Sequence, residues 1–334
     1  MYSTIEMGNI LISRTDFVKR FDRYVYNSVP FLFLIDFNVK NFFIIPLSFL
    51  ENQNSILYDF NGLSNITDTA KKNSHIKLKL KAYPISFKDY KKSFNVVFNH
   101  FLYGDSYLLN LTFPTKVETD ATMFDIFYNA NAPFKIKFFE EFVFFSPERF
   151  ILIKEGKVYT YPMKGTKIFE NKNSEIELLN NEKEMAEHLT VVDLLRNDLS
   201  MIAKNVRVNR FRYTSYIKTA NKTIIQTSSE IEGELLPGSI AEKIIKILPA
   251  GSISGAPKRK TLEIISEAEM DNRGFYTGIA GIFDGKIIDT CVIIRFIENN
   301  NNGLIYRSGG GITVYSKAEK EYQEMIDKIY VPCF

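Results

Sequence analysis

Residues 146–166 read SPERFILIKEGKVYTYPMKGT, and this stretch decides both the fold and the first candidate site residues. Two strand-like runs flank Glu155 and Gly156, a pair typical of a tight hairpin turn. If the turn centres on Gly156, Glu148 and Lys164 lie equally far from it on facing strands, with Cβ atoms about 5 Å apart. A shift of one residue in the turn would put the two side chains on opposite faces of the sheet.

An acid facing an amine allows two interpretations. An exposed ion pair would contribute little to stability, and a surface lysine commonly covers apolar neighbours with its stem. Alternatively, the two groups serve one reaction, because a lysine amine attacks only when deprotonated and a leaving hydroxyl needs a proton. The pair is therefore a candidate acid and nucleophile.

Composition excludes several classes of protein. The chain has 334 residues, of which 45% are hydrophobic and 24% charged, and this is typical of a globular protein with a large core. Its 42 Lys and Arg against 39 Asp and Glu leave a net charge of +3, too small an excess for a nucleic-acid surface. Two cysteines, Cys291 and Cys333, share no motif spacing, which excludes a disulfide scaffold and suggests a reducing compartment.

The sequence gives no sign of export or of membrane insertion. The first ten residues lack the basic and apolar regions of a secretory signal. The most apolar early stretch, residues 29–50, is interrupted by Asp36, Lys40 and two prolines and cannot supply about twenty uninterrupted apolar residues. We therefore expect a cytoplasmic protein without membrane contact.

The pattern along the chain predicts an α+β protein. Residues 1–85 look like short strands and polar turns packed on the same body as the rest, whereas residues 86–330 hold the motifs with chemical character. Apolar residues at helical spacing predict a helix over 90–101, followed by a strand over 106–113. The polar interruptions are short enough to be loops within one body.

Two predicted helices carry pairs of glutamates three residues apart. Glu184 and Glu187 lie in the helix over 181–200, and Glu321 and Glu324 lie in the helix over 316–330, which opens with Ser316 and Glu319 at capping-box spacing. For the second pair a solvated face with a Glu324–Lys328 ion pair is the alternative. Four converging carboxylates would protonate or hold a cation, and oxygen ligands without His or Cys suit Mg²⁺.

Two glycine-rich stretches suggest places where an anion approaches the backbone. Residues 248–265 place Gly255 ahead of a helix that begins near Pro257, and helix starts attract anions such as a small carboxylate. Residues 309–311 are three glycines after a strand, which predicts either a bulge or close ligand approach. Arg295 lies in an apolar run and suits bidentate pairing with a carboxylate, and Tyr276 could add a hydroxyl.

Together these stretches resemble the chorismate-utilising enzymes, and within them the component I branch of aminodeoxychorismate synthases, also called para-aminobenzoate synthases. The motifs that carry the resemblance occur in the family's order between about residues 86 and 330: SPERF, PMKGT, EHLTVVDLLRNDL, EIEGEL, PAGSISGAPK, RGFYTG, IRF and GGGITVYSKAEKEYQE. The resemblance implies a four-layer α/β/β/α sandwich.

The resemblance also implies roles for individual residues. Lys164 would add to C2 of chorismate and expel the C4 hydroxyl, Glu148 would protonate that hydroxyl, and ammonia would enter at C4 as the lysine leaves. Glu187 and Glu324 match Mg²⁺ ligands, with Glu184 and Glu321 acting directly or through water. The positions that match contacts to the substrate are Gly165, Thr166, Gly255, Lys258, Tyr276, Arg295, Gly309, Gly311 and Lys328.

By the same resemblance the ammonia comes from a separate glutamine amidotransferase subunit, and the product leads to p-aminobenzoate and folate. Leu108 stands where isochorismate and salicylate synthases carry a lysine, which argues against those activities. Gln226 stands where the family usually has a histidine. The rival interpretations are anthranilate synthase component I, in which ammonia attacks C2 directly, and a non-catalytic chorismate-binding protein.

Overall fold

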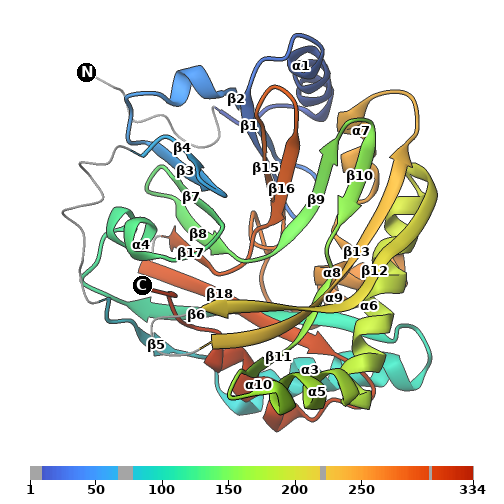
Figure 1. Cartoon of the computed structure of the whole chain (residues 1–334). Coiled ribbons are helices and arrows are strands. Elements are labelled where there is room, and N and C mark those ends of the chain that lie inside the picture. The colour runs from blue at the N-terminus through green and yellow to red at the C-terminus, as the bar shows by residue number, and fades with distance from the viewer. Residues whose placement is uncertain (1–9, 67–77, 219–222, 301–302, 334) are drawn as a thin grey trace.

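The computed structural model describes residues 10–66, 78–218, 223–300 and 303–333. Two nine-stranded antiparallel sheets form its centre (Figure 1). Sheet A has the spatial order β11 (Met163–Ile168), β13 (Thr223–Leu235), β10 (Lys157–Thr160), β9 (Arg149–Lys154), β16 (Ile288–Val292), β15 (Ile279–Phe283), β1 (Phe31–Ile35) and β2 (Phe42–Pro46), with β12 (Ala203–Lys218) paired along β13.

Sheet B has the spatial order β14 (Gly255–Ala256), β6 (Leu108–Glu118), β18 (Gly303–Ile312), β17 (Phe296–Asn300), β8 (Phe142–Ser146), β7 (Phe134–Phe138), β3 (Ile56–Phe60) and β4 (Leu63–Ser64), with β5 (Lys81–Tyr83) paired to β6. The helices are α1 (Arg14–Tyr26), η2 (Leu47–Leu50), α3 (Phe87–Leu102), α4 (Met123–Asn129), α5 (Lys172–Asn180), α6 (Glu182–Ser200), α7 (Ile240–Lys246), α8 (Gly251–Ser254), α9 (Lys258–Ala268) and α10 (Ala318–Asp327).

Alternation along single strands builds the layers. On β1, Phe31, Phe33 and Ile35 pack in the core that includes α1, while Leu32 and Leu34 pack in the core between the two sheets, as the two-residue period of a strand requires.

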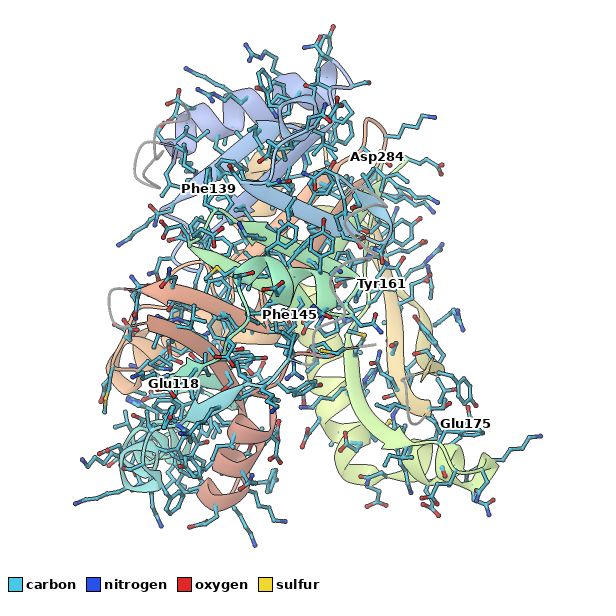
Figure 2. All side chains as sticks on the ribbon, turned by 90° about the vertical axis from the view of Figure 1, so that its left-hand side faces the viewer. Glu118, Phe139, Phe145, Tyr161, Glu175 and Asp284 are labelled. Carbon is cyan, nitrogen blue, oxygen red and sulfur yellow. The ribbon has the colours of Figure 1, made fainter. Side chains whose placement is uncertain are left out.

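On β8, Phe142 and Phe144 belong to the core between the sheets, whereas Val143 and Phe145 pack with Phe127 of α4 on the other face of sheet B. Phe145 lies near the middle of the molecule in the turned view (Figure 2). Helices thus cover the outside of two stacked sheets, which confirms the predicted four-layer α/β/β/α sandwich.

The N-terminal portion contributes strands to both sheets, because β1 pairs with β15 and β3 pairs with β7. The prediction of strands and turns alone before residue 85 is wrong for α1. Ser13 caps this helix by accepting a hydrogen bond from the Asp16 backbone N–H, and Phe17 and Phe21 on its inner face are fully buried. Phe residues four apart after a serine cap carry the helical signal in the sequence.

The helices predicted over 90–101 and 181–200 are confirmed as α3 and α6, and the strand predicted over 106–113 as β6. The capping box at the last helix is wrong. The helix α10 begins at Ala318 after Lys317, which makes no side-chain cap, and the Ser316 hydroxyl instead accepts a hydrogen bond from the Thr313 N–H. No helix in the described part of the chain is both long and apolar enough to cross a membrane.

The hairpin at Glu155 and Gly156 is confirmed, but its register differs from the prediction. Both turn residues have positive φ, 52° and 72°, and Lys154 faces Lys157, so the turn centres between the two residues rather than on Gly156. After Pro162, which cannot donate to a ladder, the chain continues as β11, which pairs with β13 and not with β9. The predicted cross-strand pair of Glu148 and Lys164 is therefore wrong.

Two crossings between the sheets define one end of the sandwich. Pro147 and Glu148 connect β8 of sheet B to β9 of sheet A, and residues 293–295 connect β16 of sheet A to β17 of sheet B. The crossings are adjacent, since the Phe145 N–H donates to the Arg295 carbonyl at 3.1 Å and the Val292 N–H donates to the Glu148 carbonyl at 3.1 Å. Glu148 and Arg295, distant in sequence, thus meet at this junction.

Candidate active site

Lys164 lies on β11, where α6 packs against the end of sheet A. Its ammonium Nζ is 3.0 Å from the Glu187 Oε2, and its side chain is 38% exposed. The Glu184 carboxylate lies beside the next residue, because a Cβ on Gly165 would be 3.0 Å from the Glu184 Oε2. Gly165 also has a φ of 85°, which glycine adopts without steric cost. The first glutamate pair and the lysine therefore share one site.

Charge governs the protonation of Lys164. Burial lowers the pKa of the Lys164 ammonium, but attraction to Glu187, Glu324 and Glu184 outweighs burial and raises the pKa above its ordinary value. Carboxylates from α6 and α10 therefore act on the same amine. In this arrangement Lys164 is held as a cation.

The second glutamate pair lies on α10 and faces the glycines of β18. A Cβ on Gly310 would be 3.6 Å from both the Glu321 Oε2 and the Glu324 Oε1. Lys328 Nζ is 2.7 Å from Glu324 and donates to the Gly309 carbonyl at 2.9 Å. The Glu324–Lys328 pair, predicted as the alternative to a metal site, is thus present, but it lies against the glycine run.

The four glutamates fit a magnesium ion in charge and donor chemistry. All are oxygen donors of the kind that Mg²⁺ prefers, and three of them act on the single Lys164 cation. As the side chains stand, no group of three or more Asp, Glu, His or Cys among the described residues is arranged to hold a metal ion. The lysine ammonium supplies positive charge among these carboxylates, and a metal ion would need these side chains to reorient.

The glycine run forms a free strand edge. Strand β17 pairs with β18 only as far as Arg307, which is opposite Phe296. Residues 308–312 of β18 pair with β6 alone. A cavity of about 150 Å³ opens at this edge, lined by Asn110, Thr112, Glu148, Ser252, Ile253, Tyr276, Thr277, Ile294, Arg295, Tyr306, Arg307, Ser308, Gly309 and Lys328. Backbone groups without side chains beside them can contact a ligand here.

Glu148 lines this cavity from the crossing between β8 and β9. Its Oε1 accepts a hydrogen bond from the Ser252 hydroxyl at 2.9 Å. Burial raises the pKa of Glu148, while the Ser252 hydrogen bond and the charges of Lys164 and Lys328 partly oppose that rise. A carboxyl group with a raised pKa can keep a proton and donate it. Lys164 is thus close enough to influence Glu148, although they are not cross-strand partners.

Arg295 and Tyr276 also line the cavity. Arg295 has a φ of 53°, donates from Nη1 to the Lys328 carbonyl at 2.6 Å, and stacks over the Tyr330 ring at 4.6 Å. No carboxylate within residues 10–66, 78–218, 223–300 and 303–333 forms an ion pair with it. The carboxylate partner expected from the sequence can therefore come from a ligand.

Other predicted contact residues lie elsewhere or serve the fold. Lys258 donates to Asp198 at 2.9 Å and to the Ile247 carbonyl at 2.7 Å, and it does not line the cavity. Gly255 does not line the cavity either, and a Cβ there would be 2.0 Å from the Leu108 carbonyl oxygen of β6. The Lys258 ammonium is bound by Asp198 and the Ile247 carbonyl, and the backbone at Gly255 packs closely against β6. Their contacts with a substrate stay predictions. The Thr166 side chain lies outside the described residues.

Gly309 and Gly311 belong to the strand edge itself. A Cβ on Gly309 would be 2.3 Å from the Leu111 carbonyl oxygen, while a Cβ on Gly311 would make ordinary contacts with Leu108 and Asn110 at 3.5 and 3.6 Å. The apolar side chain of Leu108 therefore borders the glycine run. On sheet A, Gln226 lies on β13 opposite Thr166 and contacts Met163.

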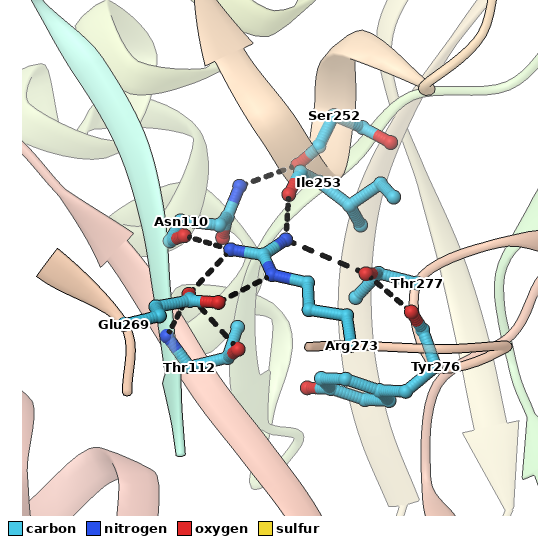
Figure 3. A network of polar contacts seen from close by, with 8 residues as sticks. All are labelled: Asn110, Thr112, Ser252, Ile253, Glu269, Arg273, Tyr276 and Thr277. Carbon is cyan, nitrogen blue, oxygen red and sulfur yellow. Dashed lines mark hydrogen bonds and ion pairs between the residues drawn. The ribbon is translucent and has the colours of Figure 1, made fainter. Parts of the chain in front are cut away.

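Several residues of this site were not singled out in the sequence. Ser252, Asn110, Thr112, Glu269 and Arg273 form a connected polar network beside the cavity (Figure 3). Ser252 lies in PAGSISGAPK and Arg273 opens RGFYTG, so the motifs contained both. Their contacts join segments more than a hundred residues apart, and spacing alone cannot reveal such pairs.

Comparison with known proteins places this site in a family. Residues 49–333 match the family described as chorismate binding enzyme. The chain belongs to the chorismate-binding enzyme family. An uncharacterized PabA-like protein of Haemophilus influenzae is 44% identical over 321 residues, covering 95% of this chain and 96% of the relative. Members of the family act on chorismate.

More distant relatives have named activities. The aminodeoxychorismate synthase component 1 of Bacillus subtilis is 37% identical and covers 55% of this chain and 40% of its own length. Anthranilate synthase component I from Streptococcus pneumoniae has a solved structure with a TM-score of 0.65 at 29% identity, covering 75% of this chain and 58% of that one. The isochorismate synthase MenF of Escherichia coli has a TM-score of 0.73 at 16% identity, covers 95% of this chain and 82% of that one, and shares the fold.

Proposed function

We propose that this protein is component I of an aminodeoxychorismate synthase, which converts chorismate and ammonia to 4-amino-4-deoxychorismate. The observation that carries the proposal is the position of Lys164, whose amine is 3.0 Å from Glu187 and close enough to influence the pKa of Glu148. Glu148 lines the cavity and Lys164 does not, but the charge of Lys164 acts on Glu148. A nucleophilic amine near a protonatable carboxyl suits a substitution that expels a hydroxyl group.

The chemistry balances as two successive substitutions. The uncharged Lys164 amine forms a bond to C2 of chorismate, the ring double bonds shift, and the C4 hydroxyl leaves as water with a proton from Glu148. Ammonia then forms a bond to C4, the double bonds shift back, and the C2–N bond to Lys164 breaks. The nitrogen bonded to C2 carries a positive charge after the attack, so it leaves as the neutral Lys164 amine. The new ammonium group at C4 can then return one proton to Glu148.

Lys164 can attack only after it loses its own proton, and the carboxylates around it oppose that loss. Glu187 and Glu324, with Glu184 and Glu321 in support, would hold Mg²⁺, which would supply positive charge to neutralise these carboxylates. With their charge neutralised, the attraction that raises the pKa of Lys164 is removed. Arg295, Tyr276, Gly165, Thr166, Gly309, Gly311 and Lys328 would orient the two carboxylates of chorismate.

The ammonia requires a source. We propose a separate glutamine amidotransferase subunit as the partner and p-aminobenzoate and folate synthesis as the destination of the product. The PabA-like names of the relatives and the aminodeoxychorismate synthase of Bacillus subtilis support this choice. Relatives named anthranilate synthase component 1, such as that of Aquifex aeolicus at 38% identity over 55% of this chain, support a second candidate in which ammonia attacks C2 directly.

Product analysis tests the proposal. The protein is incubated with chorismate, Mg²⁺ and ammonium, with and without an added aminodeoxychorismate lyase. We expect p-aminobenzoate only when the lyase is present. Release of fluorescent anthranilate without the lyase would overturn the proposal in favour of anthranilate synthase.

Lys164→Ala tests the nucleophile, with Lys167→Ala as its matched control. Lys167 lies on the same strand and pairs with the exposed Glu177. Loss of the covalent route should lower kcat/KM roughly a hundredfold or more, with residual direct amination, whereas Lys167→Ala should retain activity. Equal activities of the two variants would exclude Lys164 as the nucleophile.

A further inference from the structure

A buried ion pair supports one wall of the cavity. The side chains of Glu269 and Arg273 are 5% and 2% exposed. Arg273 donates from Nε to the Glu269 Oε2 at 2.8 Å and from Nη2 to the Glu269 Oε1 at 2.6 Å (Figure 3). Its guanidinium also stacks over the Phe37 ring at 4.4 Å. The bidentate pair is therefore fixed in position from several sides.

The remaining donors of Arg273 go to three segments that line the cavity. Nη2 donates to the Asn110 carbonyl on β6 at 2.6 Å, and Nη1 donates to the Ile253 carbonyl on α8 at 3.1 Å and to the Thr277 hydroxyl at 3.4 Å. Glu269 accepts from the Thr112 N–H at 2.8 Å and from the Thr112 hydroxyl at 3.0 Å. All four partners line the cavity.

The pair also fixes the turn that carries Tyr276. The Tyr276 N–H donates to the Arg273 carbonyl at 3.0 Å, and the Thr277 hydroxyl donates to the Tyr276 carbonyl at 2.6 Å. Thr277 has a φ of 61°, a conformation that is costly for a β-branched residue and persists only where the surroundings impose it. Arg273 thus holds a strained turn from both its backbone and its side chain.

A chain of contacts continues from the pair to Glu148. Arg273 donates to the carbonyl of Ile253, the residue after Ser252. The Ser252 hydroxyl in turn donates to Glu148 at 2.9 Å. The Ser252 carbonyl accepts from the Asn110 amide at 2.9 Å, and Asn110 is held by Arg273 as well. Ordering Ser252 orders the carboxyl group assigned as the acid.

Stability alone is a weak reason for such a pair. A buried ion pair is often no more stabilising than apolar side chains of similar volume, although removing only one partner is strongly destabilising. Apart from the stack on Phe37, the side-chain hydrogen bonds that leave this pair all go to residues lining the cavity. Their arrangement favours a role in ligand geometry.

We propose that Glu269 and Arg273 are positioning residues that hold β6, α8 and the Tyr276 turn in the geometry that binds chorismate. The proposal deepens the proposed function, since it rests on the cavity's being the chorismate site. Neither residue touches the reacting atoms; both act through Asn110, Thr112, Ser252 and Tyr276.

Four variants of the full chain separate positioning from stability: Glu269→Gln, Arg273→Lys, the apolar double variant Glu269→Leu with Arg273→Met, and Thr112→Val. The unliganded Tm and the chorismate kcat and KM are measured for each. We expect both single variants to lower the Tm and raise KM about tenfold or more, equivalent to about 1.4 kcal/mol of binding. The double variant should recover most of the Tm but keep the raised KM.

Lys243→Met is the matched control. Lys243 is a buried lysine on α7 that donates to the Gly238 and Ser239 carbonyls, and none of the three residues lines the cavity. Its loss should therefore change the Tm and leave KM unchanged. If the single variants do not fold, the double variant and Thr112→Val decide the matter, since Thr112→Val removes only one hydroxyl contact and should raise KM several-fold.

A wild-type KM in the double variant or in Thr112→Val would overturn the proposal. The identity of the product does not enter these comparisons. Anthranilate in place of aminodeoxychorismate would therefore overturn the proposed function and leave the positioning test intact.

Discussion

Two neighbouring glycines of β18 should respond to the same substitution in opposite ways. A Cβ on Gly309 would be 2.3 Å from the Leu111 carbonyl oxygen and 2.8 Å from the Thr112 Cα, both backbone atoms of β6. A Cβ on Gly310 would meet Glu321, Glu324 and Lys328 at 3.6 to 3.7 Å, which is ordinary contact. Gly309→Ala should therefore lower the Tm, whereas Gly310→Ala should leave the Tm nearly unchanged and lower the activity.

The geometry sets the magnitudes. For Gly309→Ala, β6 and β18 must separate by more than 1 Å, the difference between 2.3 Å and an ordinary contact of 3.4 Å. Overpacking of this kind costs about 1–3 kcal/mol. An unfolding entropy of about 2.1 cal/mol/K per residue gives about 0.7 kcal/mol/K for 334 residues, so the Tm should fall by about 1.5–4 °C. Gly310→Ala should leave the Tm within about 1 °C of wild type.

Gly310→Ala should affect activity without a large loss of stability. In Gly310→Ala a methyl group faces the Glu321 and Glu324 carboxylates, and this should lower kcat/KM for chorismate at least about tenfold. Thermal unfolding and steady-state kinetics at several Mg²⁺ concentrations check both effects. Wild-type activity in Gly310→Ala, or a larger fall in Tm than in Gly309→Ala, would refute the assignment of one glycine to packing and the other to the site.

Three further predictions concern protons and metal. Burial, with a contribution from Arg212, lowers the pKa of His188 to about 4, so the free energy of unfolding should fall as the pH drops from about 6.5 towards 4. In His188→Gln the free energy of unfolding, measured with urea, should fall less steeply over this range. Equal slopes for the variant and the wild type would contradict the prediction. The Ser252 hydrogen bond lowers the pKa of Glu148, so Ser252→Ala should raise that pKa and keep the acid protonated to higher pH. The kcat/KM profile of the variant should therefore extend to higher pH. A profile displaced to lower pH would exclude Glu148 as the acid. Chelation with EDTA should abolish turnover, and added Mg²⁺ should restore it. The variants Glu187→Gln and Glu324→Gln should need more Mg²⁺ than wild type for half-maximal activity. Full activity in EDTA would exclude a metal-dependent reaction.

The sequence predicted the fold class and most elements of the catalytic region. Periodicity located α3, α6 and β6, and Glu155 and Gly156 marked the hairpin between β9 and β10. These signals are local, since a helix or hairpin is encoded within about ten residues. The sequence missed α1 and the cap of α10, where a serine at suitable spacing bonds to a different backbone group.

Part of the candidate site could also be predicted. Lys164, Glu187, Glu324, Arg295 and Glu148 were all singled out from their residue types and neighbours. The structure brings Lys164 and Glu187 within 3.0 Å and places Arg295 and Glu148 on one cavity. It removes Lys258 from the cavity lining, because Asp198 and the Ile247 carbonyl bind its ammonium. A lysine's sequence context cannot distinguish a buried structural partner from a ligand.

The sequence by itself determined which groups are available: an amine after a strand, four glutamates in two helical pairs, and a glycine run. Only the tertiary structure decided which groups meet. The hairpin turn centres between Glu155 and Gly156 instead of on Gly156, and β11 pairs with β13 instead of β9. Lys164 therefore pairs with Glu187 and not with Glu148. Register and crossing points depend on contacts between distant segments, and a one-residue change in register moves every side chain to the other face of a sheet.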